Sequence, residues 1–96
     1  MENSLRIPRL KEDTSLQQND DISFLYHRFS NKVLILENKF AIDIVNSING
    51  INSVNNIIEM MIEKYEVSNV SELESDVNDL LSILQKEDFV VYCLDP

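Results

Sequence analysis

The first forty residues alternate short apolar runs with polar clusters, a pattern typical of short strands joined by turns. The run at 5–10 contains Pro8, so it is expected to form extended chain or an edge strand. A short strand is expected at 15–18, with a turn after it at 19–21. The runs at 22–27 and 33–36, joined by a turn, predict a β-hairpin.

The second strand of this hairpin is an uninterrupted apolar run: Val33, Leu34, Ile35 and Leu36. Runs of this kind usually belong to strands that are buried on both faces. A sheet of three short strands should leave one face in water. The run therefore raises the question of what covers its second side.

Beyond residue 38 the apolar positions recur every three or four residues, which is the period of an α-helix. Asn38 is expected to cap a first helix that ends at Asn49 and Gly50. Gly50 is the chain's only glycine, and a left-handed conformation after a helix explains it best. Ser53 is expected to cap a second helix, whose apolar stripe reaches Tyr65.

A third helix is predicted in the last third of the chain. Ser71 and Glu74 match the capping-box pattern, and the apolar positions that follow carry the helix to about Lys86. The apolar segment at 89–92 is expected to be a short final strand or an extended tail that packs on the core.

The order of strands, three helices and an extended end predicts an α+β fold. We expect a winged-helix-like arrangement, with an N-terminal three-stranded antiparallel sheet followed by three α-helices. Ninety-six residues leave room for one domain, spanning 1–96. The ends at 1–5 and 94–96 are expected to be flexible.

The charge of the chain is −9 and is concentrated in its second half. Residues 1–40 carry six basic and six acidic groups, whereas residues 41–96 carry eleven acidic groups against Lys64 and Lys86. Proteins that bind nucleic acids need a basic face to displace counterions from phosphates. Nucleic acid is therefore not an expected partner.

The sequence also lacks the marks of several other classes of protein. A single Cys93 rules out an internal disulfide and suits the cytoplasm, and with a single His27 it leaves no zinc site. No apolar run is long enough to span a membrane, and one glycine cannot build a phosphate-binding loop. No constellation of catalytic groups is present, so we expect no enzyme activity, no metal and no cofactor.

The spacing of four segments resembles a family signature. They are Asn-Lys-Phe-Ala-Ile-Asp-Ile at 38–44, Asn-Gly at 49–50, Ser-Val-Asn-Asn-Ile at 53–57, and Asp-Val with Leu-Leu and Leu at 76–84. Together they resemble the pyrroloquinoline-quinone biosynthesis D-protein family, and the likeness covers residues 7–92.

The resemblance implies a non-catalytic domain. Such a domain binds the leader segment of a ribosomally synthesised precursor peptide and presents it to a modifying enzyme, such as a radical S-adenosylmethionine enzyme. The family holds the leader as an added strand on the edge of the third strand of the sheet, beside the third helix. In this chain, the implied peptide-binding residues are Lys32, Val33, Leu34, Ile35, Leu36, Asp76, Asp79, Leu80 and Ile83.

The residues themselves are consistent with such a site. Strand addition needs an open edge with unpaired N–H and C=O groups and pockets for alternate side chains. On the third helix, Ile83 falls beside the apolar stripe and between Asp76 and Asp79, as a groove wall would. Simple partial burial would give Ile83 the same position. The acidic groups form either a solvated face or an attraction for basic leader residues.

Two other functions remain open at this stage. A winged-helix transcription regulator would need a basic recognition helix, and the acidic third helix opposes that. A homodimeric assembly protein could instead use the open sheet edge to pair two copies. The protein is thus expected to be a monomer or a homodimer.

Overall fold

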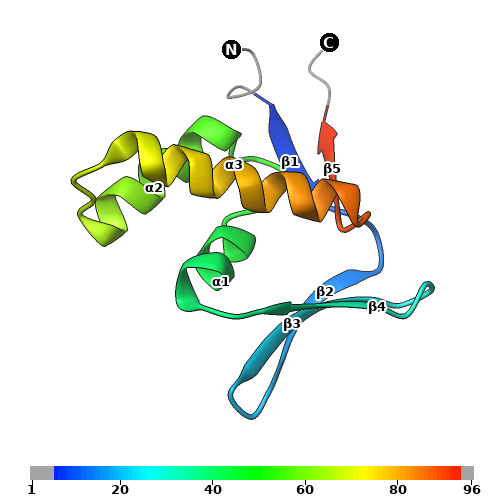
Figure 1. Cartoon of the computed structure of the whole chain (residues 1–96). Helices are drawn as coiled ribbons and strands as arrows, with labels where there is room; N and C mark the ends of the chain where they lie inside the picture. The colour runs from blue at the N-terminus through cyan, green and yellow to red at the C-terminus, as the bar shows by residue number, and fades with distance from the viewer. Residues whose placement is uncertain (1–5, 94–96) are drawn as a thin grey trace.

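The computed structural model describes residues 6–93, which form five strands and three helices (Figure 1). In chain order these are β1 (Ile7–Leu10), β2 (Thr14–Asn19), β3 (Ile22–His27), β4 (Lys32–Leu36), α1 (Lys39–Asn46), α2 (Val54–Tyr65), α3 (Val70–Lys86) and β5 (Val90–Cys93). The predicted α+β class and winged-helix-like order are confirmed. The expected flexible ends, 1–5 and 94–96, lie outside the described residues.

Strands β2, β3 and β4 form the predicted antiparallel sheet in that order, so β4 is an edge strand. Leu16, Leu25 and Leu34 lie in register across the three strands, on the face that packs against the helices. In Figure 1, α3 runs across the upper half of the view, the hairpin lies below, and α1 lies between them. We call the helix-facing side the inner face of the sheet and the opposite side its outer face.

The two ends of the described chain pair as a second, two-stranded sheet. Strand β1 is antiparallel to β5, with Pro8 opposite Tyr92. A proline fits here because neither strand of a two-stranded sheet is central. The guanidinium of Arg6 lies 3.9 Å from the centre of the Tyr92 ring, a cation–π contact. The expected edge strand and the expected final strand are therefore each other's partners.

Two predicted caps start helices as expected. The side chain of Asn38 accepts a hydrogen bond from the N–H of Ala41 at the start of α1. Ser53 accepts from the N–H of Asn56 at the start of α2, and the Asn56 side chain accepts from the N–H of Ser53 in return.

The predicted end of the first helix was wrong. Helix α1 ends at Asn46, and Ser47 caps it by donating from both its N–H and its hydroxyl to the carbonyl of Asp43. Serine competes with the helix in this way because its hydroxyl can satisfy a backbone carbonyl. Asn49 then closes a turn by accepting from the N–H groups of Ile51 and Asn52.

The predicted capping box of the third helix was also wrong. Asn69, not Ser71, is the N-cap of α3, and its side chain accepts from the N–H of Glu72. Asparagine and serine are about equally good caps, so local preference could not decide between two candidates two residues apart. The predicted end at Lys86 is confirmed.

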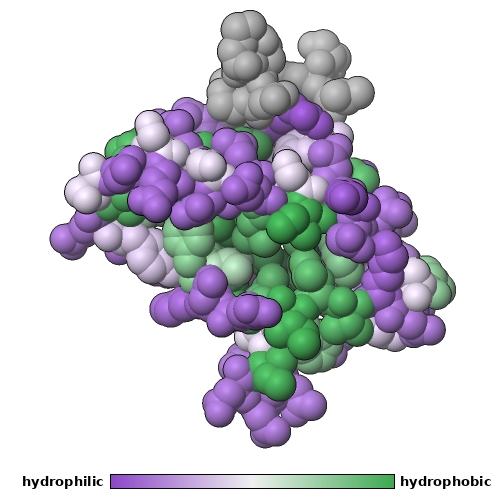
Figure 2. Space-filling model, viewed as in Figure 1, coloured by the Kyte–Doolittle hydropathy of each residue, from purple (hydrophilic) through white to green (hydrophobic). Residues whose placement is uncertain are grey.

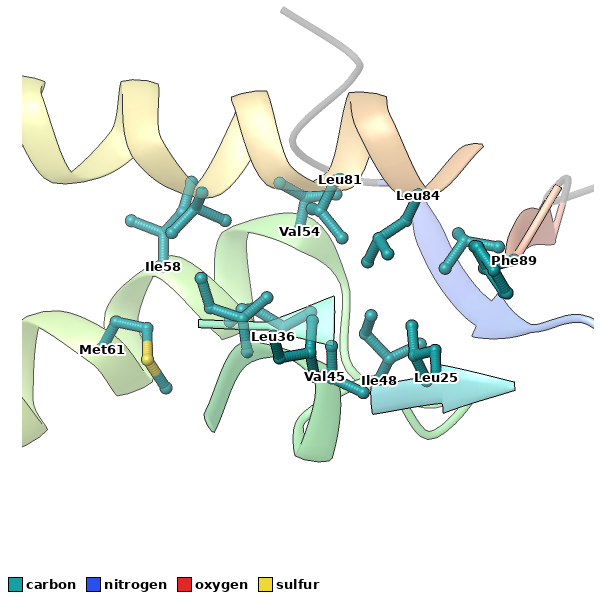
Figure 3. Close-up of a cluster of buried hydrophobic side chains, with 14 of the residues drawn as sticks. Leu25, Leu36, Val45, Ile48, Val54, Ile58, Met61, Leu81, Leu84 and Phe89 are labelled. Carbon is teal, nitrogen blue, oxygen red and sulfur yellow. The ribbon is translucent and has the colours of Figure 1, made fainter. Parts of the chain in front are cut away.

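The core is formed by apolar side chains from both sheets, all three helices and the loop after α1 (Figure 3). On α3 the buried positions are Leu73, Val77, Leu81 and Leu84, as the periodicity predicts. Leu80, which the periodicity also places toward the core, is half-buried. The other buried apolar residues are Pro8, Leu25, Leu36, Ile44, Val45, Ile48, Val54, Ile57, Ile58, Met61, Phe89 and Val90. Among residues 6–93, no helix is both long and apolar enough to cross a membrane.

Gly50 has the predicted positive φ, +78°, although it lies in the loop beyond α1 rather than at its end. A Cβ atom there would only touch the Cβ of Arg9 at an ordinary 3.7 Å, so backbone conformation decides the cost of a side chain. Replacing Gly50 by valine should destabilise the protein by about 1–2 kcal/mol, because a β-branched side chain is strained in that region.

Urea denaturation of Gly50→Val measures this cost. Gly50→Asn is the matched control, and it should lose less stability because asparagine tolerates positive φ. An equal loss for both variants would show that φ is not the cause.

Candidate functional site

The backbone of the β3–β4 hairpin fixes which groups point away from the sheet. The N–H of Arg28 donates to the carbonyl of Asp13, next to β2, at 2.9 Å. The N–H of Asn31, just before β4, donates to the carbonyl of His27 at 2.9 Å. Because successive residues of a strand direct their N–H and C=O groups to opposite sides, the odd-numbered residues of β3 bond to β4.

This alternation identifies the free groups of the edge strand. Leu25, like His27, is an odd-numbered residue of β3 and therefore bonds to β4. Its partner there is Leu34, so the main chain of Leu34 bonds to β3. Val33 and Ile35 therefore direct their N–H and C=O groups to the open edge. An extended peptide could pair with β4 through these four groups.

The side chains of β4 show that the second face of its apolar run is uncovered. Leu34 and Leu36 lie on the inner face, where Leu36 is buried and Leu34 half-buried. Val33 and Ile35 lie on the outer face and are 54% and 56% exposed. The apolar run thus faces the core on one side and solvent on the other.

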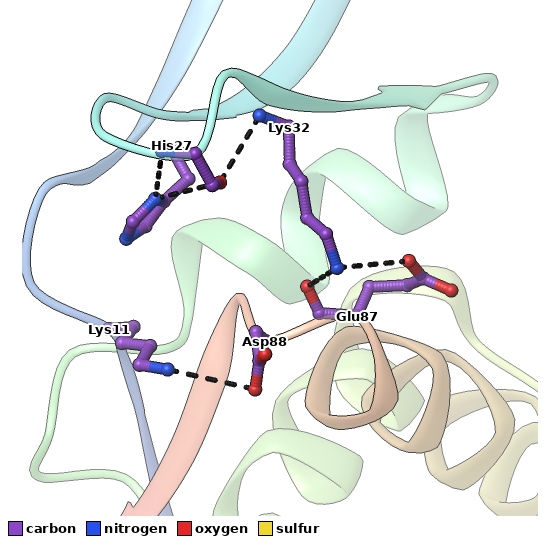
Figure 4. A network of polar contacts seen from close by, with 6 residues as sticks. Lys11, His27, Lys32, Glu87 and Asp88 are labelled. Carbon is purple, nitrogen blue, oxygen red and sulfur yellow. Dashed lines mark hydrogen bonds and ion pairs between the residues drawn. The ribbon is translucent and has the colours of Figure 1, made fainter.

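One end of α3 is tied to the start of β4. The ammonium group of Lys32 donates to the Glu87 carbonyl at 3.2 Å and lies 3.6 Å from the Glu87 carboxylate (Figure 4). Helical spacing places Ile83, Leu80 and Asp76 on the same side of α3 as Glu87, in successive turns. These four positions form what we call the α3 row.

The other end of the α3 row meets the start of α1, directly after β4. A cavity of about 180 Å³ lies there. It is lined by Phe40, Tyr65, Val67, Asn69, Glu72, Leu73 and Asp76. Hence β4 and α3 run in opposite directions along each other, from the Lys32–Glu87 contact to this cavity.

Between β4 and the α3 row lies an apolar surface, which we call the β4–α3 groove. Figure 2 shows apolar side chains gathered at the centre of this face, below α3 and above the hairpin. Leu80 is half-buried there, and Ile83 is 47% exposed.

Lys32, Leu34, Asp76, Leu80 and Ile83 lie along this groove. Val33 and Ile35 border it only with their main-chain groups, because their side chains lie on the outer face. Asp79 is exposed at the margin of the α3 row, and Leu36 is part of the core. Glu87 and Phe40 were missed. Helical spacing from Ile83 could have pointed to Glu87, whereas Phe40 carried only the pattern of a core residue.

A network of polar contacts surrounds the Lys32 end of the groove (Figure 4). Lys11 pairs with Asp88 at 3.6 Å, and the Nδ1 atom of His27 lies 2.9 Å from the Ser30 hydroxyl. Both ion pairs of this network are partly exposed, and exposed pairs contribute at most about 1 kcal/mol each. The Lys32–Glu87 pair therefore positions β4 against the end of α3 more than it stabilises the fold.

At the opposite end, Asp43 fixes the aromatic wall of the cavity. It accepts a short hydrogen bond from the Tyr65 hydroxyl and pairs with Lys64 at 3.2 Å and Lys39 at 3.5 Å. The Tyr65 bond and the two ammonium groups lower the pKa of Asp43, although burial opposes them. The same bond raises the pKa of Tyr65. The Tyr65 ring packs edge-on against Phe40, with 5.4 Å between ring centres.

Asp43→Asn should lower the melting temperature at pH 7 and flatten its pH dependence. The folded-state pKa of Asp43 is below its ordinary 3.8, so its stabilisation is present above that pH and is lost as the pH falls through the lowered pKa. The folded-state pKa of Tyr65 is above 10.0, so stabilisation is lost as the pH rises through that raised pKa.

Thermal melts of both proteins from pH 2.5 to pH 11 test this prediction. Asp79→Asn is a matched control. Because Asp79 is exposed, this substitution should leave the loss of stability at low pH and at high pH unchanged. Wild-type pH dependence in Asp43→Asn would show that Asp43 is not responsible.

Comparison with known proteins places this geometry in a family. The sequence profile described as "Coenzyme PQQ synthesis protein D (PqqD)" matches residues 33–90, more than half of the chain. No curated protein matches the chain. A solved structure described as "Lasso peptide synthetase B1 complexed with the leader peptide" is similar in fold, with a TM-score of 0.74 and 24% identity. The match covers 88% of this chain and 96% of that one. The matched profile spans β4 and α3 and confirms the resemblance seen in the sequence: this chain belongs to the PqqD family.

Proposed function

We propose that this protein binds the leader segment of a ribosomally synthesised precursor peptide as an extra strand on β4. The open edge of β4 beside the α3 row is the observation that carries the proposal. Membership of the PqqD family supports it, as does the fold shared with a protein whose structure is described with a leader peptide bound.

The geometry of the β4–α3 groove suits a short extended segment. The groove follows α3 from Leu73 to Glu87, a length of roughly 20 Å at 1.5 Å per helical residue. A strand of about six residues covers this length at 3.3 Å per residue. The N–H and C=O groups of Val33 and Ile35 supply affinity, and the side chains that enter the groove beside Leu80 and Ile83 supply selectivity.

In this proposal the protein is an adaptor and its partner performs the chemistry. The bound leader keeps the rest of the precursor within reach of a modifying enzyme in the cytoplasm, such as a radical S-adenosylmethionine enzyme. Tethering raises the effective concentration of the core segment without a new contact at the reacting bond.

Ile83→Asp should weaken leader binding at least tenfold and leave the fold intact. Ile83 is half exposed in the groove, so a carboxylate there removes apolar contact with the peptide without disturbing the core. Ser82→Asp is the matched control, because it adds the same charge to α3 on the side away from the groove.

Fluorescence anisotropy with a labelled leader peptide, chosen from precursor genes sought beside this one, measures both affinities, and circular dichroism checks folding. Equal affinities for the wild type and Ile83→Asp would show that the peptide does not bind in the β4–α3 groove. Labelled duplex DNA serves as a second probe. Sub-micromolar binding of the duplex at 150 mM salt would favour the transcription regulator instead.

A further inference from the structure

We propose that the peptide bound on β4 carries a lysine or arginine at one end, and that this side chain occupies the cavity beside Phe40. This inference rests on the proposed function and specifies the ligand it takes. We call the cavity the Phe40 pocket. Its walls are Phe40, Tyr65 and Leu73, with Glu72 and Asp76 at its rim.

The walls of the Phe40 pocket are apolar and held in place. The rings of Phe40 and Tyr65 meet edge to face at an angle of 64°. The Tyr65 hydroxyl is bound to Asp43, which is itself paired with two lysines, so the ring cannot swing into the pocket without breaking that bond. Such a wall packs well against the aliphatic stem of lysine or arginine, and an aromatic face attracts the cation at its end.

The carboxylates of Glu72 and Asp76 favour a basic side chain of the ligand over a purely apolar one. The ion pairs found within residues 6–93 engage Asp43, Glu87 and Asp88, and none engages Glu72 or Asp76. Both carboxylates are exposed to water, so an apolar ligand side chain would gain nothing from them. A basic side chain would gain an electrostatic attraction to both, and it is also attracted by a chain whose net charge is −9.

The position of the pocket sets the position of the basic residue. Asp76 lies one turn of α3 before Leu80, so the Phe40 pocket continues the groove beyond the end of β4. At the opposite end, Glu87 is already paired with Lys32. The basic residue therefore belongs at one end of the bound segment, about three to six residues from the side chains that contact Ile83.

A library of random ten-residue peptides displayed on phage, selected on the immobilised full chain at 150 mM salt, tests this inference. Three proteins are compared: wild type, Glu72→Gln/Asp76→Asn, and the control Glu63→Gln/Glu74→Gln. The control has the same net charge as the test variant, but its changed residues are exposed elsewhere on α2 and α3. Circular dichroism confirms that all three are folded.

We expect peptides with alternating apolar residues on all three proteins. Lysine or arginine should be enriched at one end on the wild type and the control but not on the test variant. A synthetic peptide from the wild-type selection should bind the test variant at least tenfold more weakly. Alternating apolar peptides without this enrichment, or with equal enrichment on the test variant, would overturn the inference and leave the proposed function intact. A failure to select alternating apolar peptides on the wild type would count against the proposed function itself.

Discussion

Replacing Ile35 by proline should reduce the affinity for the leader peptide about tenfold or more while the protein stays folded. The N–H of Ile35 points to the open edge of β4, so proline removes a donor that only the added strand uses. One lost hydrogen bond costs about 1 kcal/mol, and the ring also obstructs close approach of the peptide backbone. Edge strands tolerate proline on their free side, so the hairpin should survive.

The same change one residue earlier should have a different effect. The main chain of Leu34 bonds to Leu25 within the sheet, so Leu34→Pro removes a hydrogen bond of the sheet and leaves its partner unpaired, which should destabilise the protein by about 1–3 kcal/mol. Ile35→Thr keeps the N–H and is the matched control for binding. Anisotropy titration and urea denaturation of the three variants separate the two effects. If Ile35→Pro bound the leader like the wild type, the peptide would not pair with β4.

Leu84→Ala should destabilise the protein by about 3–4 kcal/mol, since Leu84 is fully buried and truncation leaves a cavity in a close-packed core. A domain of this size is stabilised by roughly 5–15 kcal/mol in total, so the loss is a large fraction. The carbonyl of Leu84 also accepts a hydrogen bond from the N–H of Phe89. This bond places the turn into β5 against the same core.

Ile83→Ala is the matched control, because the neighbouring side chain is half exposed and should cost less than about 1 kcal/mol. Urea denaturation with an unchanged m value measures both variants. Equal losses of stability would mean that α3 does not bury Leu84 while leaving Ile83 half exposed. The assignment of Ile83 to the groove would then be wrong.

The parts of the fold that local chemistry controls could be predicted from the sequence. Asn38 and Ser53 each stand just before an apolar stripe of helical period, and each caps the helix that follows. The errors arose where two local solutions compete. Ser47 ends α1 early by donating its hydroxyl to a carbonyl, and Asn69 begins α3 ahead of Ser71.

The candidate site could be predicted only in part, because some of its contacts join residues far apart in the sequence. The family resemblance pointed to the strand at 33–36, and the spacing of α3 marks Ile83. The contact between Lys32 and Glu87 joins residues 55 positions apart, so no local pattern reveals it. The direction of the Ile35 N–H depends on the geometry of the hairpin turn, and the turn's composition alone does not specify it.

Amide hydrogen exchange of the ¹⁵N-labelled protein, with and without saturating leader peptide, tests the central claim most directly. In the free protein, the N–H groups of Val33 and Ile35 should exchange rapidly, while those of Leu34 and Leu36 are protected by β3. Leader binding should slow exchange at Val33 and Ile35 at least tenfold, because the added strand bonds to both residues. If the leader binds and their exchange rates stay unchanged, the peptide does not extend the sheet at β4.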